Sequence, residues 1–275
     1  MKKRIATIIL NRNLPGPTDQ LCDHLLEFDG NHTDIFVVEA GSDIENLSKN
    51  TTWHANWPEA IESGLRYPRG MNYGLSQLWD EGKFEQYDAF FLLTNDTELN
   101  RSESLGPLMS ILDENQRVGI LSPCSKSWGE KLLLEDGLTK YFWFIHNTAY
   151  LLRREFIEDI CNVGSPGYLK FLFDGQNFRG YGVESELIAK AYANDWAAAI
   201  TSEVWAEENQ AHLLKHSDKI KTENYRKNID LYIQEGESWM KNKYGFNSRW
   251  QMQQYVKSFY DRFFYYHPEF RDQKV

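Results

Sequence analysis

Three apolar runs near the start of the chain each lead into a cluster of polar side chains. The runs span residues 5–10, 34–39 and 87–93, and the polar clusters lie at 11–13, 39–43 and 94–98. A carboxylate such as Asp96, just beyond a buried strand, is a hard oxygen ligand for Mg2+ or Mn2+, and such an ion can hold a diphosphate. Asp96 is therefore a candidate metal ligand, and a carboxylate that merely caps a turn is the alternative.

A second candidate is the segment that begins at Arg69 and continues as GMNYG over 70–74. Small residues and an arginine at the start of a helix suit an anion, because free N–H groups and the helix dipole point toward it. The segment has neither the GxxxxGK[ST] pattern of a P-loop nor the glycine spacing of a dinucleotide-binding turn. An ordinary turn with a surface arginine remains the alternative.

A third candidate is the pair Glu184 and Glu186, which opens a predicted helix over 184–194. Carboxylates two residues apart on a helix point to different sides, so only one of them would face a cleft. Glu184 in a cleft could act as a general base, if burial or a neighbour tunes its pKa. The alternative is that both glutamates are there because the helix dipole favours acidic residues in the first turn.

The elements that must position these residues alternate along the chain. The apolar runs predict buried strands, and helical spacing predicts helices over 18–28, 70–82 and 104–114. Such alternation predicts an α/β fold with a mostly parallel central sheet flanked by helices. Ligands of such sheets bind beyond the carboxyl ends of the strands, where the polar clusters lie. We therefore expect Glu39, Asp96 and Glu184 to converge around one cleft.

Composition excludes several classes of function. The 275 residues carry 30 Lys and Arg against 40 Asp and Glu, a formal net charge of −10. Nucleic acid is therefore not an expected partner, because phosphate contacts need a basic field. Three widely spaced cysteines fit a reducing compartment rather than a disulfide framework. No run approaches the ~18 apolar residues of a transmembrane segment.

The composition shifts near residue 215, after which Lys, Asn, Gln and aromatic residues dominate. This predicts a main domain over 1–215 and a helical, aromatic-rich C-terminal extension over 216–275 packed on it. The apolar run at 5–10 is too short for a signal peptide, so a cytoplasmic location is expected. The aromatic tail at 259–270 leaves peripheral attachment to a membrane open.

The order of five short motifs resembles that of GT-A fold glycosyltransferases of the large family 2 type, near their rhamnosyltransferase-like members. The motifs are IILNRN at 8–13, VVEAGS at 37–42, GMNYG at 70–74, LLTNDT at 92–97 and GVESEL at 182–187. The resemblance covers roughly residues 5–217. It implies a nucleotide-diphospho-sugar transferase fold and a donor linked to UDP, dTDP or GDP. It also implies an acceptor hydroxyl on a glycan or related molecule.

The resemblance also implies roles for individual residues. The donor-binding residues would be Asn11, Arg12, Glu39, Arg69, Asn72, Asn95 and Asp96. Asp96 would hold Mn2+ or Mg2+, with His212 completing the metal site and His216 as an alternative. Thr94 stands where the family usually has an acid or Asn, and this departure puts metal dependence in question. Val183 replaces the first acid of the pair in which Glu184 aligns with the catalytic base, so only one of the two acids is present.

Glu184 would be the catalytic base of a direct displacement with inversion at the anomeric carbon. Trp143 and His146 are candidates for binding the acceptor, because aromatic faces and polar groups grip sugars, although core packing would also explain them. Two alternatives remain. One is a non-catalytic protein that binds carbohydrate or nucleotide on the same fold. The other is a sugar-phosphate nucleotidyltransferase, against which the absence of a glycine-rich Gly-x-Gly-Thr-Arg segment after the first strand argues.

Overall fold

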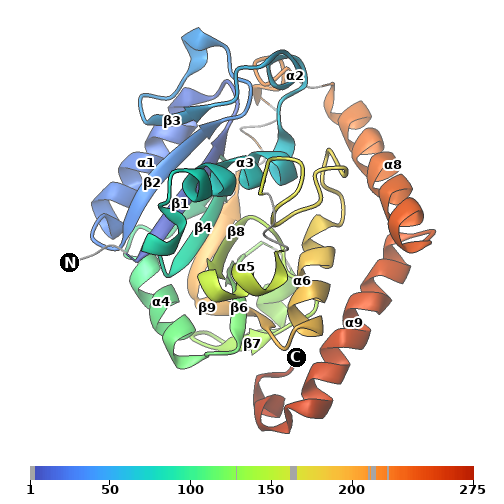
Figure 1. Ribbon diagram of the computed structural model, residues 1–275. Helices are drawn as coiled ribbons and strands as arrows, with labels where there is room; N and C mark the ends of the chain where they lie inside the picture. Colours follow the sequence, from blue (N-terminus) through green and yellow to red (C-terminus); the bar gives the residue numbers. More distant parts are fainter. Residues whose placement is uncertain (1–3, 128, 162–165, 210, 212–214, 222) are drawn as a thin grey trace.

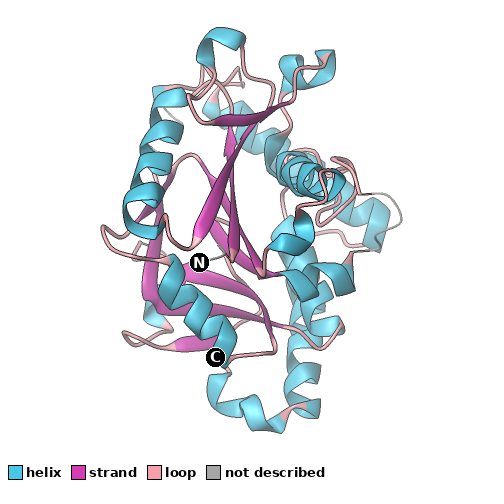
Figure 2. Cartoon of the chain, turned by 60° about the vertical axis from the view of Figure 1, so that its left-hand side comes forward, coloured by secondary structure: helices cyan, strands magenta, loops and turns pink. Residues whose placement is uncertain are grey.

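The computed structural model describes residues 4–127, 129–161, 166–209, 211, 215–221 and 223–275. Its strands form one curved layer, and helices cover both faces of that layer (Figure 1, Figure 2). The described residues contribute nine strands, in the order β3-β2-β1-β4-β8-β6-β9-β5, with β7 paired to β9. The predicted α/β architecture is confirmed.

The first half of the sheet is parallel. Its strands are β1 (Ile5–Asn11), β2 (Thr33–Glu39), β3 (Thr51–His54) and β4 (Ala89–Thr94). Most residues of β1, β2 and β4 are apolar, and the centre of each strand is buried, as expected for strands covered on both faces. Their carboxyl ends lie together at one edge of the sheet, so the first and third polar clusters become neighbours in space.

The second half of the sheet is mixed. Its strands are β5 (Thr97–Leu99), β6 (Val118–Cys124), β7 (Thr139–Tyr141), β8 (Ala149–Arg153) and β9 (Ala197–Glu208). β8 runs antiparallel to both β4 and β6, whereas β6 and β9 are parallel. The far end of β9 also pairs with β5, directly after the β4 turn. This long strand therefore brings its last residues back to the carboxyl end of β4.

The helices connect and cover these strands. They are α1 (Pro15–Asp29), α2 (Pro58–Ser63), α3 (Arg66–Asp80), α4 (Leu105–Glu114), α5 (Arg154–Ile160) and α6 (Val183–Ala193). Short 3-10 turns are η1 (Ile44–Asn46), η2 (Phe84–Gln86), η3 (Gly129–Leu132) and η4 (Pro268–Gln273). The predicted helix at 70–82 in fact begins one turn earlier, at Arg66, because a proline such as Pro68 is tolerated in the first turn of a helix. This difference places Arg66 inside α3.

Two long helices, α8 (Tyr225–Tyr244) and α9 (Arg249–Tyr266), follow the sheet. Gly245, with a φ of 74°, ends α8 in the left-handed conformation and allows the chain to turn into α9. α9 runs beside α6, and its buried residues Tyr260, Phe263 and Phe264 join the main hydrophobic core (Figure 1). The division of the chain at 215 stays a prediction. No described helix combines the length and the apolar character that a membrane span requires.

Candidate active site

Polar side chains tie together the carboxyl ends of β1, β2 and β4. Asn11 donates to Glu39 over 2.8 Å, and Asn95 donates to Asn11 over 2.8 Å and to Thr18 of α1 over 3.3 Å. Asn11 also accepts from the backbone N–H of Leu14. The network fixes the turns that follow β1 and β4, so Asn11 and Asn95 have structural partners in addition to their place beside a cavity.

The Glu39 carboxylate is completely buried. Its two oxygens accept four hydrogen bonds, from the side chains of Asn11, Ser42 and Thr51 and from the backbone N–H of Ser48. A carboxylate has about four acceptor positions, and all of them are used here. The resemblance implied that Glu39 binds the donor, but in the structure this side chain holds the loop after β2 and its acceptor positions are used within the protein.

A cavity of about 210 Å³ opens where β1 and β4 end. Its lining residues are Leu10, Asn11, Arg12, Leu14, Ala40, Gly64, Arg66, Thr94, Asn95, Asp96, Glu208 and Ile220. Part of the lining is apolar, with leucine, alanine and isoleucine side chains. The lining also includes two guanidinium groups and two carboxylates. The combination suits a ligand with a flat apolar part and a charged part.

Arg12 and Arg66 supply positive charge to this cavity. Arg12 donates through Nη2 to the carbonyl oxygens of Ile61 and Glu62, but its Nε and Nη1 are buried with no hydrogen-bond partner among the described residues. The Nε of Arg66 is in the same situation. Burial, together with the nearby Arg66 charge, lowers the pKa of Arg12 to about 10. Two partly buried guanidinium groups, each with a buried N–H donor that has no partner among the described residues, are an environment that an anionic ligand relieves.

The backbone around these arginines is specialised. Arg66 is one of four described non-glycine residues with a positive φ, at 54°. Such a conformation costs of order 1–3 kcal/mol and persists where the surrounding structure requires it. Gly64 makes room for the partner arginine, because a Cβ at that position would lie 2.2 Å from Nη1 of Arg12. The chain thus accepts backbone strain to present both guanidinium groups at one cavity.

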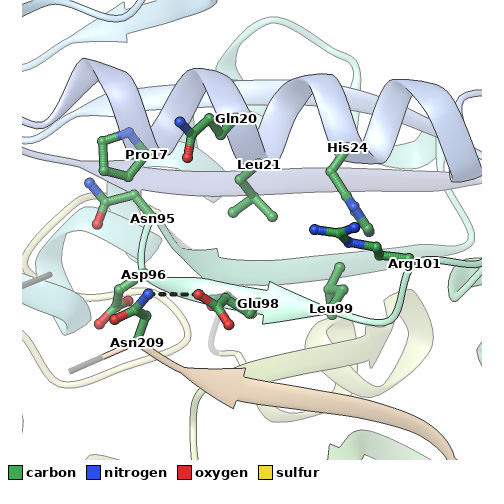
Figure 3. Close-up of a pocket in the computed structure, with 11 residues that line it drawn as sticks. Pro17, Gln20, Leu21, His24, Asn95, Asp96, Glu98, Leu99, Arg101 and Asn209 are labelled. Carbon is green, nitrogen blue, oxygen red and sulfur yellow. Dashed lines mark hydrogen bonds between the residues drawn. The ribbon is translucent and has the colours of Figure 1, made fainter. Parts of the chain in front are cut away.

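Asp96 lies on the turn between β4 and β5 and is 5% exposed. It also lines a second cavity of about 380 Å³, between α1 and β5, where Glu98 accepts from Asn209 over 2.6 Å (Figure 3). Glu208, at the end of β9, is the register partner of Thr97 and lines the smaller cavity with Asp96. The site therefore contains a second carboxylate that the sequence motifs did not identify.

Asp96 and Glu208 are hard oxygen ligands, which suits Mg2+ or Mn2+. Across the described residues, no group of three His, Cys, Asp or Glu side chains lies close enough together to hold an ion. The predicted ligand His212 lies outside the described residues. The described carboxylates therefore fit an ion that shares its coordination with phosphate oxygens of a ligand, as bound Mg2+ commonly does.

Glu184 is the second residue of α6, two positions after Gly182, which caps the helix with a φ of 84°. Its carboxylate is 6% exposed, and burial raises its pKa although Arg249 acts in the opposite direction. Nη2 of Arg249 lies 3.3 Å from Oε1 of Glu184. Glu184 does not line the 210 Å³ cavity, and neither does Glu39. The structure therefore does not bring Glu39, Asp96 and Glu184 together around one cavity, as the sequence had predicted.

Tyr232 of α8 interacts electrostatically with Glu184 and with Glu208. Burial raises the pKa of Tyr232, and the charges of both Glu184 and Glu208 raise it further. Burial and the charge of Glu184 likewise raise the pKa of Tyr67, the residue after Arg66. The base candidate therefore interacts electrostatically with tyrosines of α3 and α8.

The two predicted acceptor-binding residues separate in the structure. His146 lies against Phe144 and near Arg249, and burial together with the Arg249 charge lowers its pKa to about 4. It therefore belongs to the surroundings of Glu184. Trp143 instead packs against Tyr260 of α9, with centroids 5.2 Å apart, and lies under Lys257. Trp143 contributes to the contact between the sheet and the C-terminal helix.

Arg69 and Asn72 of α3 do not line the cavity. Arg69 donates to the carbonyl oxygen of Gly175 over 2.8 Å and pairs with Glu59 at 2.8 Å. Asn72 is buried and exchanges hydrogen bonds with the backbone of Phe173, at 2.8 and 2.9 Å. Both side chains hold the 166–175 loop. The sequence predicted both as donor-binding residues, from the resemblance and from a helix start at Gly70 that is one turn later than in the structure.

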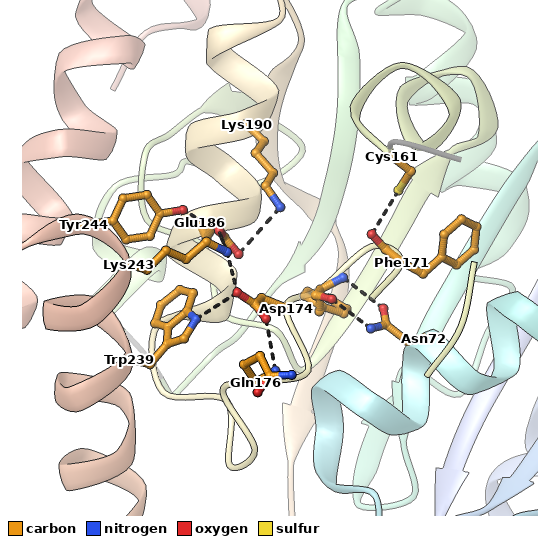
Figure 4. Close-up of polar contacts among 11 residues, drawn as sticks. Asn72, Cys161, Phe171, Asp174, Gln176, Glu186, Lys190, Trp239, Lys243 and Tyr244 are labelled. Atoms are coloured by element: carbon orange, nitrogen blue, oxygen red, sulfur yellow. Dashed lines mark hydrogen bonds and ion pairs between the residues drawn. The ribbon is translucent and has the colours of Figure 1, made fainter. Parts of the chain in front are cut away.

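Glu186 points to a different side of α6 from Glu184, as predicted. It pairs with Lys243 at 2.7 Å and with Lys190 at 3.6 Å, and Tyr244 donates to it (Figure 4). Lys243 also pairs with Asp174. The two acids at the start of α6 are therefore each matched by a cation from the C-terminal helices, Glu184 by Arg249 and Glu186 by Lys243.

The segment 215–221 lies over the 210 Å³ cavity. Asn13 donates to the carbonyl oxygen of Lys219 over 2.7 Å, and Lys221 pairs with Asp43 at 2.6 Å. Ile220, between them, lines the cavity. The polar clusters after β1 and β2 therefore also bind residues 219–221, which lie about two hundred positions later in the chain.

Sequence reasoning missed Arg66, Glu208, Tyr232 and Arg249. Arg66 could have been considered from the sequence, because it lies three residues before Arg69, which was predicted to bind an anion at the start of the same helix. Glu208 ends an apolar strand and could have been flagged by the same rule that flagged Asp96. Tyr232 and Arg249 carry no local signal, since only the docking of α8 and α9 brings them to α6.

No family model matches this sequence, and no curated protein matches it. Solved structures do resemble the fold. The structure of TarS 1–349 from S. aureus in complex with UDP is 13% identical, with 86% of this chain and 72% of that chain covered and a TM-score of 0.52. The complex of the same protein with UDP-GlcNAc covers 95% and 72%, at 13% identity and a TM-score of 0.51.

A mannosyltransferase from Pyrobaculum calidifontis, in complex with GDP-Man and Mn2+, is also similar. It is 12% identical, with 94% of this chain and 74% of that chain covered and a TM-score of 0.50. Likeness at this level of identity concerns the fold. The curved α/β sheet flanked by helices, with its polar edge at the ends of β1, β2 and β4, is the GT-A fold of nucleotide-sugar transferases.

Proposed function

We propose that this protein is a glycosyltransferase that moves a sugar from a nucleoside-diphosphate sugar to a hydroxyl group of a glycan or related acceptor. One observation carries the proposal. Arg12 and Arg66 present buried, unused N–H donors at a cavity that also contains Asp96, beyond the carboxyl ends of β1 and β4. The likeness to structures that hold UDP, UDP-GlcNAc and GDP-Man supports it.

The donor would bind with its charged part toward the arginines. Guanidinium groups recognise phosphate oxygens through several N–H donors, and the unused donors of Arg12 and Arg66 would serve in this way. The apolar part of the lining, including Ala40 and Ile220, would contact the nucleoside. Asp96 and Glu208 would hold Mn2+ or Mg2+, which supplies charge neutralisation for the leaving diphosphate.

The chain's own groups would then carry the transfer. Glu184 would accept the proton of the acceptor hydroxyl while that oxygen bonds to the anomeric carbon. The bond from the anomeric carbon to the diphosphate oxygen breaks, and the negative charge that develops there faces Arg12 and Arg66. Attack opposite the leaving group would invert the anomeric configuration. Inversion and the rhamnosyltransferase-like subtype remain predictions from the sequence.

A non-catalytic binding protein on the same fold is the second candidate. It is favoured by the ion pair that occupies Glu184 and by Thr94 and Val183, which stand where acids are expected. Turnover separates the two candidates. A transferase releases nucleoside diphosphate from a donor sugar with acceptor present, or slowly with water, whereas a binding protein retains the donor unchanged.

The test is a thermal-unfolding screen of UDP-, dTDP- and GDP-linked sugars, with and without Mn2+. A ligand at 100 times its Kd stabilises the native state by about 2.7 kcal/mol. For a protein of this size, we expect a rise in Tm of about 5 °C or more with one donor class. The matched control is the double variant R12Q/R66Q, which should not respond. The proposal is contradicted if no donor raises Tm in the wild-type protein.

A further inference from the structure

Arg249, the first residue of α9, contacts Glu184 from outside the sheet domain. Its Nη2 lies 3.3 Å from Oε1 of the carboxylate. The guanidinium also lies over two aromatic rings, 5.3 Å from the centroid of Phe144 and 5.1 Å from that of Tyr181. Arginine stacks on aromatic faces, and such stacking restricts its motion. The cation is therefore held in place beside the acid.

A second contact fixes the start of α9 against α6. Gln253, one turn after Arg249, donates to the hydroxyl of Ser185 over 2.9 Å. Ser185 is the residue next to Glu184. Further along, Val256 and Tyr260 of α9 are fully buried in the main core. The position of Arg249 relative to Glu184 is consequently set by a packed helix.

The groups that face Glu184 come from every neighbouring element. α3 contributes Tyr67 and α8 contributes Tyr232, both neutral phenols whose pKa is raised. α9 contributes Arg249, and His146, near that arginine, has a pKa lowered to about 4, so it is neutral at pH 7. Within α6, Ser185 donates to the carboxylate over 3.5 Å. Arg249 is thus the one charged group among the described contacts of Glu184.

A buried carboxylate surrounded by neutral groups tends to hold its proton, because burial disfavours the charged form. A protonated Glu184 could not accept a proton from an acceptor hydroxyl. A guanidinium within hydrogen-bond distance opposes this by favouring the carboxylate form. The fold therefore supplies, from its last long helix, the charge that a buried base needs.

We propose that Arg249 is a positioning residue, which holds Glu184 ionised and oriented toward the acceptor hydroxyl. The assignment deepens the proposed function and rests on it for the use of Glu184 as base. It gives the C-terminal helices a part in the reaction. Transfer would require the start of α9, whereas donor binding at Arg12 and Arg66 would not.

The first experiment follows the ionisation of Glu184 without any substrate. The protein is labelled with 13C at the glutamate carboxyl carbon, and the Glu184 signal is assigned as the one missing in E184Q. An opposite charge at this distance moves a carboxyl pKa by about 1–3 units. We therefore expect R249Q to raise the titration midpoint of Glu184 by about one pH unit or more.

Two further variants control this experiment. R249K keeps a cation at the position and should restore most of the wild-type midpoint. K257Q removes the same charge two turns along α9, at a side chain that is likewise 38% exposed, and should leave the midpoint unchanged. A midpoint that moves no more in R249Q than in K257Q overturns the inference. R249M, which keeps the aliphatic stem of the side chain but removes its charge, should raise the midpoint in the same way and keeps this decision available if R249Q does not fold.

The second experiment measures transfer against pH. Loss of Arg249 should move the acidic limb of the kcat/KM profile upward by the same shift as the NMR midpoint, while the Tm increase caused by donor stays at the wild-type value. If wild-type protein transfers no sugar, the proposed function fails, and the NMR titration still decides the ion pair. If transfer occurs and the R249Q profile keeps the wild-type limb, the inference alone fails.

Discussion

The side-chain amide of Asn11 donates to the carboxylate of Glu39 across 2.8 Å, and the two residues are register partners at the ends of β1 and β2. The pair joins two parallel strands at the edge where the cavity opens. It also explains how a carboxylate can be completely buried in this place, because four donors satisfy it. The first prediction concerns this pair.

Replacement of Asn11 by leucine removes one donor to the buried Glu39 carboxylate and keeps the number and branching of the side-chain heavy atoms. We expect N11L to lower the free energy of unfolding by about 2–3 kcal/mol, since hydrogen bonds to charged groups contribute about 1.5–3 kcal/mol. Urea unfolding measures the change. T18V, which removes only neutral hydrogen bonds of Thr18, is the control and should cost about 1 kcal/mol. Equal losses in both variants would contradict the role of the carboxylate.

Asp96 should be required for metal-dependent donor binding. We expect D96N to weaken donor affinity in the presence of Mn2+ by ~100-fold or more, because even residues that only support metal ligands change metal affinity 10–100-fold. Isothermal titration calorimetry with donor measures it. E98Q is the matched control, because Glu98 lies two residues away, faces the larger cavity and should keep wild-type affinity (Figure 3). Metal-dependent affinity retained in D96N would reject the assignment.

Arg66 and Arg69 lie one turn apart on α3, and only the first lines the 210 Å³ cavity. We expect R66Q to weaken nucleoside diphosphate binding by about 10–100-fold, since a charge-assisted hydrogen bond contributes about 1.5–3 kcal/mol. R69Q should stay within about 2-fold of wild type, because Arg69 binds Gly175 and Glu59 instead. Competition with a fluorescent nucleotide measures both. The reverse ranking would favour the assignment made from the sequence.

Glu184 and Glu186 form a natural pair of test and control on α6. General base catalysis contributes ~10²–10⁴-fold, so E184Q should lose at least ~100-fold in transfer rate while it keeps donor affinity. E186Q changes an equally buried acid that pairs with Lys243 and should retain transfer within about 10-fold. Single-turnover assays measure the rates. A transfer rate in E184Q close to that of E186Q would identify another group as the base.

Asp29 provides a pH test that is independent of the active site. Its carboxylate is completely buried and accepts from the backbone N–H groups of Ser104 and Leu105 at the start of α4, and burial raises its pKa. A carboxyl with a raised folded pKa binds more protons in the native state, so its contribution to stability falls as pH rises from about 4 through the folded pKa.

The variant D29N keeps the acceptor but does not titrate. We expect its free energy of unfolding relative to wild type to increase between about pH 4 and pH 7, as followed by urea unfolding at several pH values. T33V, a buried change at the start of the neighbouring strand without a titratable group, should show a pH-independent difference from wild type. A pH-independent difference for D29N as well would mean that the pKa of Asp29 is not raised.

The sequence by itself determined the fold class and the edge at which the site lies. Apolar runs at β1, β2 and β4 identify buried parallel strands, and their carboxyl ends must meet at one edge because the hydrogen-bond ladder aligns them. Asp96 and Arg12 follow directly from these strand ends. Periodicity also identified α6 and placed Glu184 and Glu186 on different sides of it.

Only the tertiary structure decided which of these polar residues are available to a ligand. Glu39 and Asn72 have the right types and positions, but hydrogen-bond partners distant in sequence use their polar atoms. Arg249 lies 65 positions from Glu184, and only the packing of α9 on α6 brings them together. Local sequence patterns indicate the period of a strand or helix. Side-chain pairings between distant residues depend instead on how the folded helices and strands pack against one another, which is a property of the whole core.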